Sequence, residues 1–178
     1  MKRGFELVSK YKDKGVKLPV RATQNAAGYD FFAAEDFLLP SIWKLNFIKI
    51  FWRLKKGEVL SDQDYIDAAE VMRPLLVPTG IKAYMQPDEY LMLADRSSNP
   101  LKRGLILPNG VGIVDSDYYN NPNNEGEIFF QLVNCGPRDY LVKKGDRLGQ
   151  GIFIPYLRAD NEDKPLGTRT GGFGSSGR

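Results

Sequence analysis

Short apolar runs separated by many turn residues restrict what this chain can fold into more than any other feature. The 178 residues include 18 glycines and 11 prolines, two residue types that interrupt helices and suit turns between strands. The runs between them have the length of strands, and residues 151–156 are rich in β-branched and aromatic side chains. The pattern predicts one all-β domain of the sandwich, jelly-roll or barrel type.

Individual elements can be placed by their apolar residues and by the turns between them. We expect strands within residues 71–84 (two strands around the turn Pro78-Thr79-Gly80), 90–93, 104–107, 110–114, 127–133 and 151–156. One segment carries helix signals instead, because Ser61 can cap a helix and Asp64 stands at the capping-box position. Apolar residues at helical spacing follow, and Pro74 should end the helix.

The absence of histidine removes several kinds of active site. Without His, the chain cannot form a Ser-His-Asp triad, a Cys-His pair or a His-ligated zinc site. Acid or base chemistry must come from Asp, Glu, Lys or Tyr. The only cysteine, Cys135, cannot form an intrachain disulfide, and we expect it to be an inert core residue in a reducing cytoplasm. We expect neither a signal peptide nor a membrane span.

Two short polar motifs could hold a charged ligand, although each also has an ordinary structural explanation. Asp30 follows the turn glycine Gly28, an arrangement that also fits a turn entering a strand. Arg96 with Ser97 and Ser98 offers a fixed fork of N–H donors and two hydroxyls, which suits phosphate oxygens. A solvated loop has the same composition, so neither motif identifies a site by itself.

Residues 109–118 combine backbone and side-chain features that suit a flat ligand. The glycines Gly110 and Gly112 would let the backbone come close to such a ligand. Asp115 follows an apolar pair and is well placed as a base, and Tyr118 offers an aromatic face. A plain hairpin with a polar end fits the same spacing.

The last residues, 167–177, are rich in glycine, serine and threonine with a single large apolar residue, Phe173. Backbone N–H groups in such a segment can cradle phosphates, and Phe173 could stack on a base. It is not a Walker loop, since no Lys-Ser/Thr pair follows the glycines. Composition alone favours a disordered end.

These four segments occur in order together with Gly-Asp-Arg-Leu-Gly-Gln at residues 145–150, and the set closely resembles the five motifs of the trimeric dUTPases, of bacterial or phage type. The resemblance covers about residues 18–178 apart from an inserted segment, 40–71. It implies a β jelly roll (β-clip), a homotrimer whose active sites use residues from all three subunits, and Mg²⁺ as cofactor. It also implies a core over residues 1–157 and a flexible arm over 158–178 that closes over the site.

The activity implied by the resemblance is hydrolysis of dUTP to dUMP and pyrophosphate, which keeps uracil out of DNA and supplies dUMP for dTMP synthesis. Asp115 would activate the water that attacks the α-phosphorus, Gln150 would contact phosphate and this water, and Asp30 would reach Mg²⁺ through a water. The other matched positions would bind substrate: Arg96, Ser97 and Ser98 the phosphates, Asn109 and the Gly112 backbone the uracil edge, Tyr118 the deoxyribose, Phe173 the uracil face, and Arg169, Gly174, Ser175 and Ser176 the triphosphate.

The chain departs from the family pattern at several positions. Asp95 and Ser98 replace the usual Pro and Gly of the second motif. Thr168 stands where the tail usually has Arg, and we expect Arg169 to contact the γ-phosphate instead. Residues 120–125 lengthen the loop that follows the third motif.

Two other functions compete with this interpretation. A dCTP deaminase shares the fold and an Arg-Ser-Ser sequence, but Gln131 occupies the position of its catalytic Glu, and glutamine cannot shuttle a proton. An interaction protein is the second alternative, because residues 40–71 contain interleaved aromatic and basic residues. This insertion either packs on its own trimer or docks a partner such as a repressor, as extra segments of phage relatives do. Nucleic acid is a weaker option since the patch is small.

Overall fold

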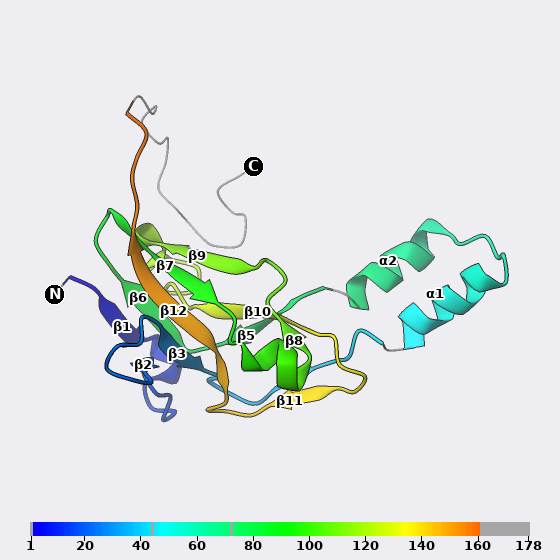
Figure 1. Cartoon of the computed structure of the whole chain (residues 1–178), viewed down its shortest axis with the longest axis horizontal. Helices are drawn as coiled ribbons and strands as arrows, with labels where there is room; N and C mark the ends of the chain where they lie inside the picture. Colours follow the sequence, from blue (N-terminus) through cyan, green and yellow to red (C-terminus); the bar gives the residue numbers. More distant parts are fainter. Residues whose placement is uncertain (1, 44, 72, 161–178) are drawn as a thin grey trace.

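The computed structural model describes residues 2–43, 45–71 and 73–160, and it shows an all-β body with a helical hairpin at one end (Figure 1). The strands are β1 (Gly4–Leu7), β2 (Val20–Arg21), β3 (Tyr29–Phe32), β4 (Phe37–Leu39), β5 (Leu75–Pro78), β6 (Ile81–Tyr84), β7 (Glu89–Ala94), β8 (Leu105–Ile106), β9 (Val111–Asp115), β10 (Phe129–Asn134), β11 (Tyr140–Val142) and β12 (Arg147–Pro155). In the described residues the largest sheet has the order β2-β3-β12-β7-β9, a second has β5-β10-β8, and β1-β6 and β11-β4 form pairs. The all-β prediction is confirmed.

The main core lies between these sheets. Successive residues of β7 and β10 alternate between buried and partly exposed, which is the period expected when one face of a strand packs inward. Phe31, Leu91 and Phe130 are fully buried there, and the Phe31 and Phe130 ring centroids are 5.7 Å apart. Burying a side chain of this size stabilises the fold by about 1.5–3 kcal/mol.

Strand β12 passes close to the core at Gly149, where only a glycine leaves room for the neighbouring groups. This close packing gives a stability prediction. A Cβ atom on Gly149 would overlap the Phe130 ring and stand 2.8 Å from the carbonyl oxygen of Ala94. Because neither group can move away freely, Gly149→Ala should lower the free energy of unfolding by about 1–3 kcal/mol in urea denaturation. Gly4→Ala is the control, since its Cβ would meet only the end of the Tyr84 side chain. Equal losses in both variants would contradict this explanation.

Every segment predicted as strand contains one, and the structure excludes the plain hairpin that also fitted the spacing of residues 109–118. Residues 107–110 do form a turn, in which the Gly110 N–H donates to the Leu107 carbonyl at 3.0 Å. The strands on either side, however, pair elsewhere: β8 pairs with β10 and β9 pairs with β7. The turn at residues 107–110 therefore connects strands of two different sheets and does not close a paired hairpin.

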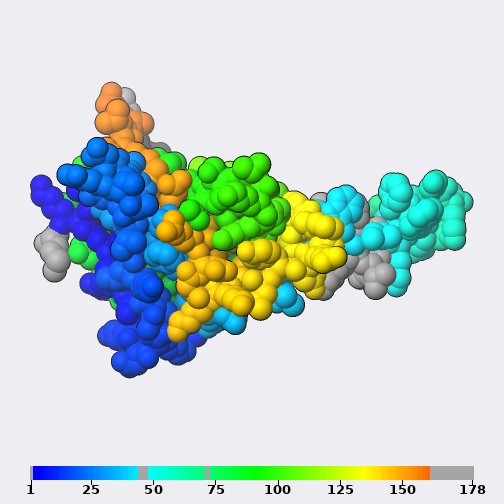
Figure 2. Space-filling model, turned by 60° about the horizontal axis from the view of Figure 1, so that its bottom comes forward, coloured from blue at the N-terminus to red at the C-terminus, as the bar shows by residue number. Residues whose placement is uncertain are grey.

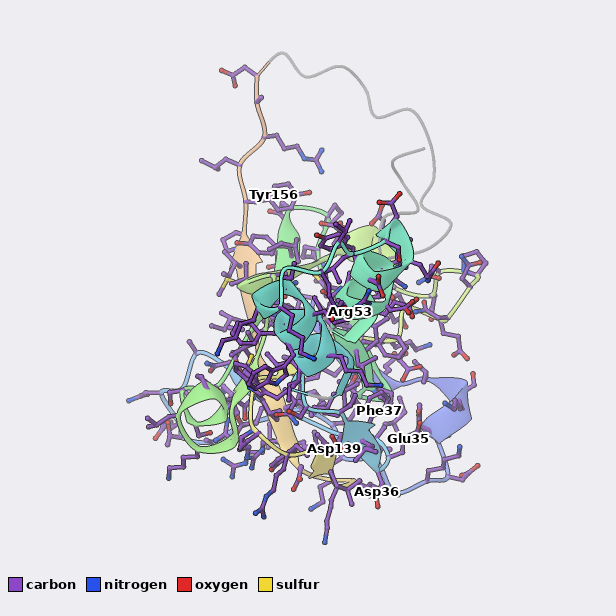
Figure 3. The ribbon with its side chains drawn as sticks, turned by 90° about the vertical axis from the view of Figure 1, so that its right-hand side faces the viewer. Glu35, Asp36, Phe37, Arg53, Asp139 and Tyr156 are labelled. Carbon is purple, nitrogen blue, oxygen red and sulfur yellow. The ribbon has the colours of Figure 1, made fainter. Side chains whose placement is uncertain are left out.

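The insertion forms two helices where the sequence predicted one: α1 (Leu45–Lys55) and α2 (Asp62–Val71). The predicted capping box of α2 is confirmed, because the Ser61 N–H donates to Asp64 Oδ2 at 2.8 Å and the Asp64 N–H donates to Ser61 Oγ at 3.3 Å. The Ser61 N–H and the Ser61 hydroxyl, which both donate to the Asp64 carboxylate, lower the pKa of Asp64 to about 2, together with the Arg53 guanidinium. The ion pair between Arg53 on α1 and Asp64 on α2 links the two helices. Figure 3 views this hairpin end-on, with Arg53 labelled. In the described part of the chain, no helix is both long and apolar enough to cross a membrane.

The helical hairpin projects from the body (Figure 2), and we call it the helical arm to distinguish it from the C-terminal arm. Its base is fixed to the segment between β10 and β11. The Ser41 N–H donates to Asp139 Oδ1 at 2.9 Å, and the Trp43 indole N–H donates to the Cys135 carbonyl at 3.0 Å. Cys135 itself is partly exposed. The expectation that it is a core residue is therefore wrong, since it lies on the loop that anchors the arm.

Candidate functional site

Three of the motifs meet on one row of the largest sheet. Asp30 on β3 is the register partner of Gln150 on β12, and Gln150 is the register partner of Ala94 on β7. The Gln150 side-chain amide donates to the Asp95 carbonyl at 3.4 Å. Gly28 makes room for this amide, because a Cβ there would overlap Gln150 Oε1. Strand pairing thus brings the first, second and fourth motifs together within one chain, so that their side chains can contribute to a single site.

Asp30 forms the charged centre of this row. Its Oδ1 lies 3.6 Å from Arg96 Nε, and its Oδ2 lies 3.2 Å from Arg147 Nη1. The carboxylate is buried, and a buried charge is tolerated when it is paired in this way. Each guanidinium has five N–H donors, so Asp30 can orient both arginines while other donors serve a phosphate. The sequence reasoning did not single out Arg147, although it stands inside the fourth motif.

The loop that carries Arg96 is held in place by its own side chains. The Asp95 carboxylate accepts from the Arg96 N–H at 2.7 Å and from the Asn99 amide at 2.7 Å. Asn99 is fully buried and also donates to the Leu148 carbonyl at 2.6 Å. Asp95 therefore replaces the family's rigid Pro with hydrogen bonds. Ser97 is exposed, and Ser98 stands at the N-cap position of the π-helical turn η2 (Asn99–Arg103) without a side-chain capping hydrogen bond.

Asp115 lies away from these residues in the same chain. It ends β9 opposite Tyr90 at the start of β7, whereas Val111 at the other end of β9 faces Ala94. Four residues of strand separate the two ends, a rise of about 13 Å. A general base must come within hydrogen-bond reach of the proton it removes. One chain therefore does not place Asp115 beside Arg96 and Gln150.

The remaining predicted substrate contacts divide between the ends of β9. Asn109 is exposed in the turn before the strand, and Gly112 is paired with Leu93 near the Arg96 end. Tyr118 lies at the Asp115 end, in the 3-10 turn η3 (Ser116–Tyr118), and it is 6% exposed. Its hydroxyl donates to the Glu127 carbonyl at 2.9 Å.

The predicted arm lies outside the described residues from 161 onward, and so do its expected contacts Arg169, Phe173, Gly174 and Ser175. The chain leaves the sheet after β12, where the Tyr156 hydroxyl donates to the Pro87 carbonyl at 2.7 Å (Figure 3).

A magnesium ion fits this donor set only if substrate and water supply most of its ligands. Within the described ranges, no group of three or more His, Cys, Asp or Glu residues is arranged to hold a metal. Mg²⁺ keeps several waters and commonly binds through one or two carboxylates and substrate phosphates. Since both Asp30 oxygens face guanidinium groups, an indirect contact through water suits Asp30 better than direct ligation.

Comparison with known proteins gives the family. The sequence profile of dUTPase matches residues 59–177. The chain belongs to the dUTPase family. A relative in Lactococcus lactis subsp. lactis (strain IL1403), deoxyuridine 5′-triphosphate nucleotidohydrolase, is 44% identical over 176 residues, which cover 98% of this chain and 97% of that protein. A protein of the same name in Desulfitobacterium hafniense (strain DSM 10664 / DCB-2) is 33% identical over 172 residues, with 93% and 91% covered.

Solved dUTPase structures share the fold. The crystal structure of the Streptococcus mutans dUTPase has a TM-score of 0.69 and 42% identity, covering 89% of this chain and 99% of that one. The dUTPase of phage phi11 of S. aureus, described with a species-specific insert, has a TM-score of 0.62 and 15% identity, covering 92% and 96%. The predicted β jelly roll and the predicted family are therefore confirmed, and the activity of this family is hydrolysis of dUTP to dUMP.

Proposed function

We propose that this chain hydrolyses dUTP to dUMP and pyrophosphate at active sites shared between the subunits of a homotrimer. The observation that carries the proposal is the separation of Asp115 from Arg96 and Gln150 along β7 and β9. In a closed ring of identical subunits, one surface of each subunit meets a different surface of the next. The Asp115 end of one subunit would then face the Arg96 end of its neighbour.

Asp115 acts as the general base in this mechanism. Water is a poor nucleophile, and a carboxylate that takes its proton as the bond to the α-phosphorus forms lowers the barrier. A carboxylate suits a chain without histidine. Gln150 orients this water and a phosphate oxygen through its amide, which Gly28 allows to lie close to the backbone.

The phosphates bind to the row around Asp30. Arg96 and Arg147 hold their guanidinium groups against this carboxylate, so they are oriented before the substrate arrives. Fixed donors aimed at developing negative charge stabilise a transition state more than mobile ones do. Ser97 and Ser98 add hydroxyl donors beside them.

Asp30 would help to hold Mg²⁺ through a water, and the ion would supply neutralisation of part of the phosphate charge. The D95N variant of the phage phi11 dUTPase, 15% identical, is described with a coordinated structural Mg(II) ion. The C-terminal arm, residues 158–178, would close over the site on substrate, with Phe173 on the uracil and Arg169, Gly174, Ser175 and Ser176 around the triphosphate.

Base and sugar specificity come from the third motif. Asn109 and the backbone at Gly112 pair with the uracil edge, and cytosine would leave these groups unpaired. Tyr118 packs on the deoxyribose and excludes a 2′-hydroxyl. The deaminase alternative lacks its carboxylate, since Gln131 stands in β10 at that position. We place the enzyme in the cytoplasm, where a lone cysteine stays reduced and where it would keep uracil out of DNA.

Pyrophosphate release from dUTP, dCTP, dTTP and UTP with Mg²⁺ tests the function. We expect fast release from dUTP alone. Release from dCTP or dTTP at a comparable rate would contradict the proposed substrate, and no release from dUTP by the folded protein would contradict the activity.

The arm formed by α1 and α2 supports a second role, docking of a protein partner such as a repressor. Phe51, Trp52 and Leu54 on α1 are 59%, 53% and 50% exposed. A groove of about 440 Å³ between the helices includes Ile48 and Trp52 in its lining, and the lining contains no residue of the proposed active site. Large apolar side chains gathered on one exposed element mark interaction surfaces. The phage 80alpha dUTPase, 15% identical, is described as controlling transfer of virulence genes.

Replacing residues 45–71 with a short Gly-Ser linker separates docking from packing on the protein's own trimer. The anchors Ser41 and Trp43 remain in this variant. If the arm docks a partner, dUTP hydrolysis should stay within about twofold of wild type and the sedimenting species should remain a trimer, because surface changes remote from a site have small effects. Dissociation of the trimer, or loss of hydrolysis, would show that the arm packs on its own assembly.

A further inference from the structure

The lengthened loop after Tyr118 forms a clamp on that residue. We propose that Asn124 is a positioning residue that fixes the Tyr118 ring and thereby sets discrimination between deoxyribonucleotides and ribonucleotides. This inference rests on the proposed function, in which Tyr118 packs on the deoxyribose. The clamp lies within residues 120–125, the segment by which this chain lengthens the loop of the family pattern, so it belongs to the sequence of this chain.

The Tyr118 hydroxyl is held from two sides. It accepts from the Asn124 side-chain amide at 2.8 Å and donates to the Glu127 carbonyl at 2.9 Å. A phenol hydroxyl has one donor, and here both its donor and an acceptor site are used. Because the ring is also 6% exposed and packed in the main core, it cannot slide along its own plane without breaking a buried hydrogen bond.

Asn124 is itself held by the loop. Its Oδ1 accepts from the Gly126 N–H at 3.1 Å and from the Asn121 amide at 2.7 Å. Asn121 is 4% exposed and also donates to the Tyr118 carbonyl at 3.0 Å. The side-chain amides of Asn121 and Asn124 therefore connect the loop to Tyr118. These contacts make the loop a fixed support for Tyr118.

The backbone of the loop is shaped for this contact. Asn120 and Glu125 adopt φ values of 56° and 59°, a conformation that non-glycine residues seldom take. The Asn120 N–H donates to the Glu125 carbonyl at 3.1 Å, and the Glu125 carboxylate accepts from the Ser9 N–H at 3.1 Å. Gly126 has a φ of 80°, and a Cβ there would stand 2.5 Å from the Tyr118 carbonyl. Strained conformations persist when surrounding contacts hold them, and here those contacts close the loop over Tyr118.

A held ring matters because rejection of a 2′-hydroxyl is steric. A Tyr118 ring that can shift would make room for the extra oxygen, whereas a ring fixed in position would not. Losing one hydrogen bond of ordinary strength changes an equilibrium by about tenfold at most. We therefore expect Asn124 to account for up to about tenfold of the preference for dUTP over UTP.

The test compares kcat/KM for dUTP with kcat/KM for UTP in wild type, Asn124→Ala, Tyr118→Phe and the double variant. The ratio of the two values does not depend on how much of a preparation is active, so a partly unfolded variant still gives a valid result. Asn124→Ala should lower the ratio about fivefold to tenfold, and Tyr118→Phe at least as much. The double variant should match Tyr118→Phe, because both changes remove the same interaction.

Two further variants separate positioning from general damage to the loop. Asn123→Ala is the matched control, since the Asn123 backbone N–H, rather than its side chain, makes the hydrogen bond to Asn121 Oδ1, and it should keep the wild-type ratio. Asn124→Asp keeps the acceptor for the Gly126 N–H and removes the donor to Tyr118, so it should lower the ratio like Asn124→Ala. If the wild type is active and both Asn124→Ala and Asn124→Asp keep the wild-type ratio, the proposed role of Asn124 is wrong while the proposed dUTP hydrolysis stands. A wild type that does not hydrolyse dUTP would overturn the proposed function and the clamp with it.

Discussion

Replacing Asp115 with asparagine is expected to lower kcat for dUTP hydrolysis by about 10²–10⁴-fold, the range that a positioned general base contributes. Asparagine has nearly the same shape but cannot accept the proton of the attacking water. The change should act on the chemical step, so KM should shift far less than kcat. Steady-state release of pyrophosphate, followed by a single-turnover measurement, would separate the two.

Asp117→Asn is the matched control for this prediction. Asp117 is an exposed neighbour in η3, and the same loss of one charge there should leave kcat within about twofold, as expected for an exposed residue away from the reacting atoms. If Asp117→Asn removed the activity and Asp115→Asn did not, the base would have been assigned to the wrong carboxylate.

Arg96→Ala is expected to lower kcat/KM by about 10²–10³-fold, the cost of removing one fixed donor to a developing negative charge. Arg96→Lys should recover little of this loss, because an ammonium group cannot present the planar fork that Asp30 orients at 3.6 Å. Asp30→Asn should give an intermediate loss, since both Arg96 and Arg147 would lose the carboxylate that holds them.

The control removes a guanidinium elsewhere. Arg73 is exposed at the end of the helical arm and pairs with Glu70 at 3.8 Å; Arg73→Ala should leave kcat/KM unchanged. Full activity in Arg96→Lys would show that Arg96 supplies only charge, and the oriented fork would not be part of the mechanism.

Much of the fold follows from local patterns in the sequence. Turn residues and the short apolar runs between them located the strands, and Ser61 with Asp64 located the start of α2. Helix α1 was missed because no cap signal directly precedes it and because its interleaved aromatic and basic residues were interpreted as a surface patch, although their spacing is helical. The pairing of β8 and β9 with different partners was also missed. Local spacing identifies a strand but does not say which neighbour it pairs with, since tertiary packing decides that.

The site was only partly predictable for the same reason. The motifs contain Asp30, Arg96 and Gln150 as separate segments, and only the register of β3, β12 and β7 brings them together. That register also puts Asp115 about 13 Å further along the sheet, a separation that no motif spacing encodes. Asn124 lay in a segment that the sequence analysis treated only as added loop length, because its role depends on side-chain hydrogen bonds to Tyr118.

Mixing two inactive variants tests the central claim, that each active site is shared between subunits. Asp115→Asn and Arg96→Ala proteins would be denatured together at equal amounts and refolded. If Asp115 of one subunit serves Arg96 of its neighbour, random mixing gives about a quarter of the sites both intact residues, and about a quarter of the wild-type activity should return. If instead Asp115 and Arg96 of the same chain form one site, every site in the mixture lacks one of them, and the activity would stay at the level of the separate variants.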